Sequence, residues 1–158
     1  MDNKVVTTLA KVFVEMGYVT VRFNFRGVGQ SAGSFGHGTG ETEDLLAVAA
    51  HMRGQMGDLP LLLAGFSFGG AVQTLANQTL AAQRLVLVAP AVKHVEARAV
   101  PDNTLVIHGE QDDVVPLTDV MDWARPQDLP ITVVPGAGHF FHGRLLTLKR
   151  IILNSCQC

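Results

Sequence analysis

Apolar and polar positions along this chain of 158 residues follow two patterns that alternate. Short apolar runs, which are typical of buried strands, predict strands at residues 18–25, 59–66, 84–89, 104–108 and 131–134. Apolar side chains spaced three and four positions apart, which are typical of amphipathic helices, predict helices at residues 3–16, 41–54, 68–77, 117–124 and 144–153. This alternation predicts an α/β fold, with a doubly wound and mostly parallel sheet flanked by helices.

Composition agrees with that fold class. Hydrophobic residues make up 47% of the chain and charged residues 16%, which suits a parallel sheet covered on both faces. We expect a single domain over residues 1–154, and a frayed, reduced tail at residues 155–158 that contains both cysteines, Cys156 and Cys158. Two cysteines this close together at one end make neither a disulfide framework nor a zinc site.

The most informative motif lies at residues 65–69, Gly-Phe-Ser-Phe-Gly. A predicted strand leads into it and a predicted helix leads out, so Ser67 stands at the apex of a tight turn. Such a turn lifts a serine hydroxyl clear of the sheet and places it at a helix N-terminus, where backbone N–H groups stabilise an oxyanion. We therefore interpret Ser67 as a candidate nucleophile, and we expect Gly65 and Gly69 to relieve steric clashes in the bend.

A serine nucleophile needs a histidine base and a carboxylate that orients the base. The predicted strand at residues 104–108 runs into a loop with Asp112 and Asp113, and the next predicted strand runs into a loop with His139. The carboxyl ends of parallel strands meet at one edge of a sheet, so both loops are expected beside Ser67. The order serine, carboxylate, histidine is the order found after the G-x-S-x-G turn.

On these motifs the chain resembles the α/β-hydrolase superfamily, and specifically the small lidless bacterial serine hydrolases of the dienelactone hydrolase and serine aminopeptidase-like group. The resemblance runs nearly end to end, and it rests on residues 22–31, 65–69, 108–116 and 136–143. It implies that Ser67 is the nucleophile, His139 the general base and acid, and the Phe68 backbone N–H an oxyanion donor. It also favours Asp112 over Asp113, because the acid of the family stands three residues after the strand-ending glycine, here Gly109.

The chain departs from the family pattern at its N-terminal end. Relatives carry further strands before the first helix, and the loop between the last of them and that helix supplies the second oxyanion donor. Two interpretations stay open: the chain is a fragment of a longer protein, or residues 18–25 pair directly with the strand before Ser67. The function we predict is hydrolysis of small esters or amides through a Ser-His-Asp triad. The alternative is a catalytically weak or inactive fragment, or a binding protein on the same fold.

Segment length, charge and hydrophobicity indicate which substrates and partners to expect. Residues 91–103 are too few to form a helical cap, so we expect an open site and a small ester or amide substrate. Twelve Lys and Arg against fourteen Asp and Glu leave no basic field for nucleic acid. No apolar stretch is long enough for a membrane span, and we expect a cytoplasmic protein. The sequence leaves the natural substrate and the oligomeric state open.

The sequence gives weaker support to two other kinds of site, a phosphate-binding loop and a metal site. The glycines between residues 27 and 40 do not have the spacing of a phosphate-binding loop. His108 could ligate a metal together with Asp112, Asp113 and His142, but these residues already fit the triad loops, and a histidine at a strand end needs no metal. We therefore predict neither a cofactor nor a metal. We expect His37, His51 and His94 to face solvent, and Arg26 to brace its own loop.

Overall fold

A parallel sheet forms the centre of the computed structural model, which describes residues 3–156. Its four strands follow one another in space as they do in sequence: β1 (Leu62–Phe66), β2 (Arg84–Val88), β3 (Leu105–Gly109) and β4 (Ile131–Val134). The pairing aligns Phe66 with Val88 and Val88 with Ile107. The carboxyl ends of β1 and β2 therefore lie level at one edge of the sheet, and the predicted α/β fold is confirmed.

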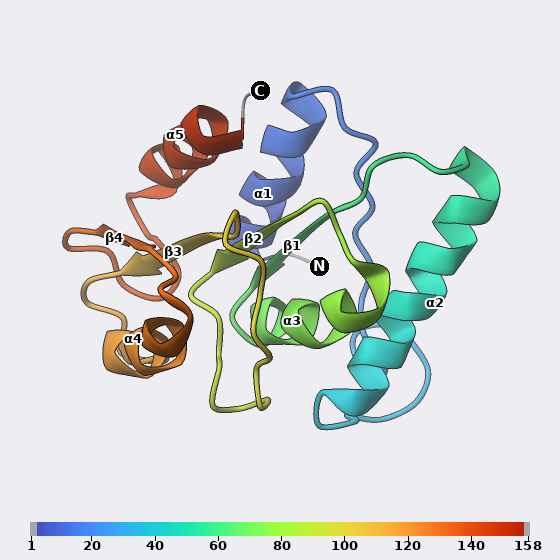
Figure 1. Cartoon of the computed structure of the whole chain (residues 1–158), viewed down its shortest axis with the longest axis horizontal. Helices are drawn as coiled ribbons and strands as arrows, with labels where there is room; N and C mark the ends of the chain where they lie inside the picture. Colours follow the sequence, from blue (N-terminus) through green and yellow to red (C-terminus); the bar gives the residue numbers. More distant parts are fainter. Residues whose placement is uncertain (1–2, 157–158) are drawn as a thin grey trace.

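Helices cover both faces of the sheet (Figure 1). On one face lie α1 (Lys4–Glu15) and α5 (Leu145–Cys156), which pack together. On the other lie α2 (Thr39–Met56), α3 (Phe68–Leu80) and α4 (Leu117–Ala124), the last followed by a short 3₁₀ helix (Arg125–Gln127). None of the helices within residues 3–156 is long and apolar enough to cross a bilayer.

Strand β2 shows how the sheet is buried from both sides. Val86 and Val88 join the core that contains the apolar residues of α1 and α5, whereas Leu85 and Leu87 join the core beneath α2 and α3. Successive side chains of a strand point to opposite faces, so an uninterrupted apolar run is what a strand between two helical layers requires. The sequence pattern at this strand predicts its position correctly for that reason.

Residues 18–25 do not form the strand that their apolar pattern predicts. They run as an extended segment without strand pairing, and β1 is the edge of the sheet on that side. A strand exists only when a neighbour accepts and donates its backbone hydrogen bonds, and no segment within residues 3–156 pairs with residues 18–25 in this way. The interpretation that this segment pairs directly with the strand before Ser67 is therefore wrong.

Several predicted ends also shift. The predicted strand at residues 59–66 begins only at Leu62, and α3 continues past the predicted end at Asn77 to Leu80. Helix α2 passes through Gly54 and ends where Gly57 adopts a φ of 73°, a left-handed conformation that glycine adopts without strain.

The predicted frayed tail is wrong for its first two residues. Helix α5 extends to Cys156, whose side chain is buried in the core against α1. Apolar packing by a helix face outweighs the fraying expected at a chain end. Residues 157 and 158 of the predicted tail, including Cys158, lie outside the described residues.

Candidate active site

Ser67 stands between β1 and α3 in a strained bend. Its φ of 53° and ψ of −123° are rare for a residue with a side chain, and neighbouring backbone holds it there. The Ser67 N–H donates to the Val88 carbonyl at 2.9 Å, and the Ser67 carbonyl accepts from the Ala91 N–H at 3.0 Å. The end of β2 therefore fixes the turn that presents the serine hydroxyl.

The two glycines of the turn are not equivalent. A Cβ atom on Gly65 would lie 2.6 Å from the Gly69 carbonyl oxygen, so only glycine fits where β1 meets the start of α3. A Cβ atom on Gly69 would meet only the Phe25 ring, at 3.9 Å. The expectation that glycines relieve a clash in the bend holds for Gly65 and is wrong for Gly69.

His139 reaches Ser67 from the loop after β4. Its Nε2 lies 3.0 Å from Ser67 Oγ, and its Nδ1 lies 2.7 Å from Asp112 Oδ2. Because a carboxylate only accepts, Nδ1 carries the proton and Nε2 is left with a lone pair for the serine hydroxyl. The imidazole is 3% exposed and contacts the rings of Phe66 and Phe140, which restrain its orientation.

The carboxylate that contacts His139 belongs to Asp112. One of its oxygens accepts the His139 N–H, and the other accepts the backbone N–H groups of Val114 and Val115, at 3.0 and 2.8 Å. Its side chain is fully buried, whereas Asp113 is exposed. The structure thus brings together Ser67, His139 and Asp112, and it leaves Asp113 outside the cluster.

The loop that contains Asp112 and the loop that contains His139 are joined by backbone hydrogen bonds. The Gln111 N–H donates to the Ala137 carbonyl at 2.9 Å, and the Glu110 N–H donates to the Val134 carbonyl at 3.1 Å. A Cβ atom on Gly109 would collide with the same Ala137 carbonyl, so glycine is required at this crossing. These contacts hold Asp112 and His139 at a constant separation.

His108 lies beneath this arrangement, at the end of β3, and is fully buried. Its Nε2 lies 2.9 Å from the Val115 carbonyl and 3.5 Å from Asp112 Oδ2, so Nε2 carries a proton that faces both oxygens. Val115 in turn donates its N–H to Asp112. Sequence reasoning treated His108 as an ordinary strand-end residue. The available signal was its position four residues before Asp112, across the turn from strand to loop.

Burial lowers the pKa of His108 below its ordinary value, even though its bond to Val115 and the Asp112 charge oppose this shift. The imidazole therefore stays neutral to a lower pH in the folded chain than in the unfolded chain, where its pKa is about 6.5. Near and below that pH the unfolded state binds more protons than the folded state, so stability falls as the pH falls.

We expect His108→Gln to reduce this pH dependence, because glutamine keeps an N–H donor but does not titrate. Between pH 7.5 and 5.5 the free energy of unfolding, measured by urea titration, should fall further in the wild type than in this variant, by up to about 1 kcal/mol. The matched control is His94→Gln at an exposed histidine, which should leave the wild-type pH dependence unchanged. Equal pH slopes in the wild type and His108→Gln would contradict a neutral, buried His108.

A backbone N–H group without an acceptor lies at the start of α3, beside Ser67. Phe68 is the first residue of the helix, and its backbone N–H has no acceptor within the described part of the chain. The Phe68 ring contacts the rings of Phe25 and Phe35, which ties the helix start to the loop before α2. That loop is braced by Arg26, whose guanidinium pairs with Asp44 at 2.8 Å, as the sequence predicts.

The structure also shows where the remaining histidines and the candidate metal ligands lie. His37, His51 and His94 are exposed, as expected. Across residues 3–156 there is no group of three or more His, Cys, Asp or Glu side chains arranged to hold a metal ion. His142, one of the residues considered as a metal ligand, instead lies against the Phe140 ring.

Comparison with known proteins gives a matching family model and several similar structures. The family model described as serine aminopeptidase, S33, matches residues 3–101. The chain is 40% identical to a solved α/β serine hydrolase homologue from Coxiella burnetii, with a TM-score of 0.90 over 99% of this chain and 78% of that one. It is 42% identical to a solved α/β serine hydrolase without a lid from Xanthomonas campestris, with a TM-score of 0.91 over 98% of this chain and 73% of that one.

A curated relative is also similar to this chain over part of its own length. An uncharacterized protein of Rickettsia prowazekii is 30% identical over 165 residues, which cover 89% of this chain and 66% of the relative. The chain therefore spans slightly less than two thirds of that relative and about three quarters of the two solved structures.

Proposed function

Because this chain belongs to the serine aminopeptidase (S33) family of α/β-hydrolases, we propose that it hydrolyses small esters or amides by acyl transfer through Ser67. The observation that carries the proposal is the continuous hydrogen-bonded chain from Ser67 Oγ through His139 to Asp112. Three residues from three separate loops make it, and the hydroxyl, base and carboxylate stand in the order that nucleophilic catalysis requires.

The first half of the reaction forms an acyl-enzyme. His139 Nε2 takes the Ser67 proton while Oγ attacks the substrate carbonyl carbon, and the carbonyl oxygen becomes an oxyanion facing the Phe68 N–H. Asp112 stabilises the imidazolium through the Nδ1–H bond. His139 then gives its proton to the leaving alcohol or amine, the carbon–oxygen or carbon–nitrogen bond breaks, and the acyl group stays on Ser67.

The second half releases the acyl group. His139 takes a proton from a water molecule, whose oxygen attacks the acyl carbon, and a second oxyanion forms beside the Phe68 N–H. Collapse of this intermediate breaks the bond to Oγ, and the proton on His139 returns to Ser67. Water is the only co-reactant, and the products are a carboxylic acid and the alcohol or amine released first.

An open, partly apolar site favours small acyl groups. Between β2 and β3 the chain makes only turns, so no helical cap covers Ser67 from that segment. The rings of Phe35 and Phe140 are 57% and 46% exposed, and they contact Phe68 and His139 respectively. These rings offer apolar contact beside the nucleophile.

A panel of p-nitrophenyl esters tests the proposal. We expect kcat/KM for acetate and butyrate esters to exceed that for a palmitate ester by about tenfold or more, because an open site gives a long chain little additional burial. Faster hydrolysis of the long-chain ester would contradict the argument from the open site. A folded chain that hydrolyses none of the esters would instead support a binding protein on the same fold.

A further inference from the structure

His108 contacts Asp112, but the acyl transfer described above gives it no role. It lies near the carboxyl end of β3, on the same face of the sheet as Val106, two residues earlier. Val106 belongs to an apolar core together with Val115 and Val120. An apolar side chain would suit this position, yet it holds a fully buried imidazole.

The polar contacts of this imidazole all lead to the loop with Asp112. Its Nε2 lies 2.9 Å from the Val115 carbonyl oxygen and 3.5 Å from Asp112 Oδ2. The shorter contact is a hydrogen bond, and the longer one is an electrostatic contact with the carboxylate charge. Asp112 Oδ2 is also the oxygen that accepts the His139 Nδ1–H, at 2.7 Å. The N–H groups of His108 and His139 therefore face the same carboxylate oxygen.

The second ring nitrogen of His108 shows that the imidazole does more than fill space. Nδ1 is buried, and it has no hydrogen-bond partner within the described residues. An unpaired buried acceptor costs free energy that an apolar side chain of similar size would not cost. What the imidazole adds over such a side chain is the Nε2–H directed at Val115 and Asp112.

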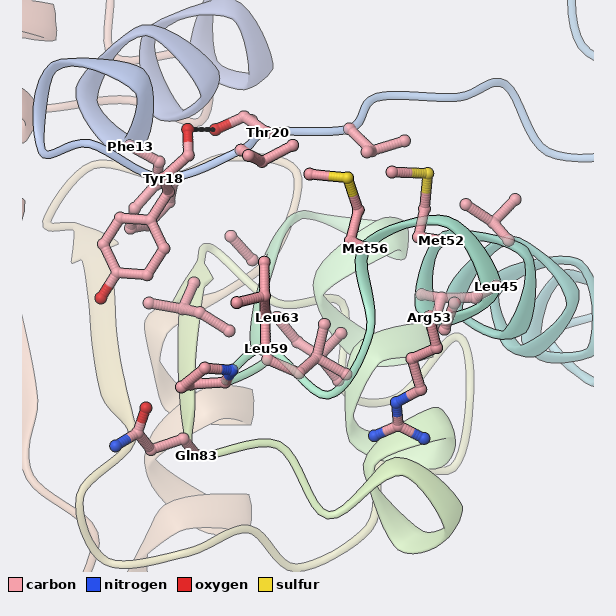
Figure 2. Close-up of a pocket in the computed structure, with 18 of the residues that line it drawn as sticks. Phe13, Tyr18, Thr20, Leu45, Met52, Arg53, Met56, Leu59, Leu63 and Gln83 are labelled. Carbon is pink, nitrogen blue, oxygen red and sulfur yellow. Dashed lines mark hydrogen bonds between the residues drawn. The ribbon is translucent and has the colours of Figure 1, made fainter.

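The contacts of His108 are independent of how the β1 edge of the sheet is covered. Beyond β1 lies an apolar groove of about 480 Å³, which Met52 and Met56 of α2 line (Figure 2). The lining of this groove includes no residue of the loops with Asp112 and His139. His108 lies on β3, which has β2 on one side and β4 on the other.

We propose that His108 is a positioning residue for the reaction at Ser67: its Nε2–H holds the Val115 carbonyl and Asp112 Oδ2, and so keeps the carboxylate directed at His139. This role rests on the proposed hydrolysis. Without the Nε2–H, Val114 and Val115 still hold Oδ1, but Oδ2 keeps only its bond to His139. The terminal torsion of aspartate is soft, so the carboxylate then turns more easily and orients His139 less well.

Kinetics of two variants test this role. His108→Leu is expected to lower kcat for p-nitrophenyl butyrate by about tenfold or more with little change in KM, because leucine fills the space without an N–H donor. His108→Gln places an amide N–H near the position of Nε2 and should restore kcat to within about threefold of the wild type. Equal kcat in the wild type and His108→Leu would overturn the proposal.

Thr104→Val is the matched control. Thr104 is also buried, its Oγ1 has no partner within the described residues, and it lies just before the opposite end of β3. Its replacement should leave kcat unchanged. A loss of kcat equal to that of His108→Leu would overturn the proposal, because any change along β3 would then have the same effect.

A double-mutant cycle separates positioning from a general folding defect. Because His108 acts through Asp112, His108→Leu should cause no further loss of kcat when Asp112→Asn is already present. Thermal unfolding shows the temperature at which all four proteins are folded, and kcat is measured below it. The same loss of kcat in both backgrounds would overturn the proposal.

Proton NMR tests the same role without a substrate. The His139 Nδ1–H resonance, assigned by its absence in His139→Gln, should be visible in the wild type and in His108→Gln, and should exchange faster with solvent in His108→Leu. Equal exchange in His108→Leu and the wild type, or a wild type without the resonance, would overturn the proposal. The expected exchange pattern in a chain without turnover would support the role of His108 and contradict only the proposed hydrolysis.

Discussion

Ser67→Ala is expected to lower kcat for a short ester by about four to six orders of magnitude, because no other hydroxyl in the cluster can form the acyl-enzyme. Ser67 Oγ is the atom within 3.0 Å of His139 Nε2, and alanine leaves that base with nothing to activate but water. Steady-state kinetics with p-nitrophenyl butyrate measures the loss. A fluorophosphonate probe, with the modified peptide located by mass spectrometry, should label the wild type at Ser67.

Ser34→Ala provides the matched control for that experiment. Ser34 is exposed in the loop before α2, and its replacement should leave both turnover and labelling unchanged. Labelling that persists in Ser67→Ala would assign the nucleophile to another residue. A folded wild type that takes no label would show that the hydrogen-bonded cluster lacks a working oxyanion site. That result would favour the alternative, a binding protein on the same fold.

Asp112→Asn is expected to lower kcat by about three to four orders of magnitude with little change in KM. The asparagine amide donates where the carboxylate accepts, so it favours the imidazole tautomer with its proton on Nε2. That proton then points at Ser67 Oγ, and His139 no longer acts as a base. The remaining amide oxygen still accepts the N–H groups of Val114 and Val115, so the loop is expected to keep its conformation.

Asp113→Asn is the neighbouring control, and its kcat should stay within about twofold of the wild type. Asp113 is exposed and makes none of the hydrogen bonds that hold His139. Thermal unfolding of both variants separates a catalytic loss from a folding defect. Comparable losses of kcat in the two variants would contradict the assignment of the acid to Asp112.

The candidate site was predictable from sequence because its signals are local. Each residue follows a short apolar run that is recognisable by itself, and the order of serine, acid and histidine is read along the chain. The close approach that makes glycine necessary at Gly65 also belongs to one turn. By contrast, the choice between Asp112 and Asp113 needed a family resemblance, since nothing local to the two aspartates separates them.

Burial of single groups was decided by distant segments. His108 is fully buried because the loop with Asp112 folds back over it, and Cys156 is buried because α5 packs against α1. Sequence patterns describe neighbours along the chain, but desolvation depends on residues far along it. Neither position carried a local signal strong enough to replace the ordinary expectation of a strand-end histidine and a frayed tail.

Residues 18–25 show where local sequence pattern stops being informative and contacts between distant segments decide the structure. The sequence by itself determines only that their apolar pattern is that of a buried strand, and the structure forms no strand there. Whether they form a strand depends on a partner that donates and accepts hydrogen bonds, and tertiary structure places β1 across a groove from them instead. Side-chain periodicity is set residue by residue, whereas strand pairing is a property of two segments and exists only where both are present.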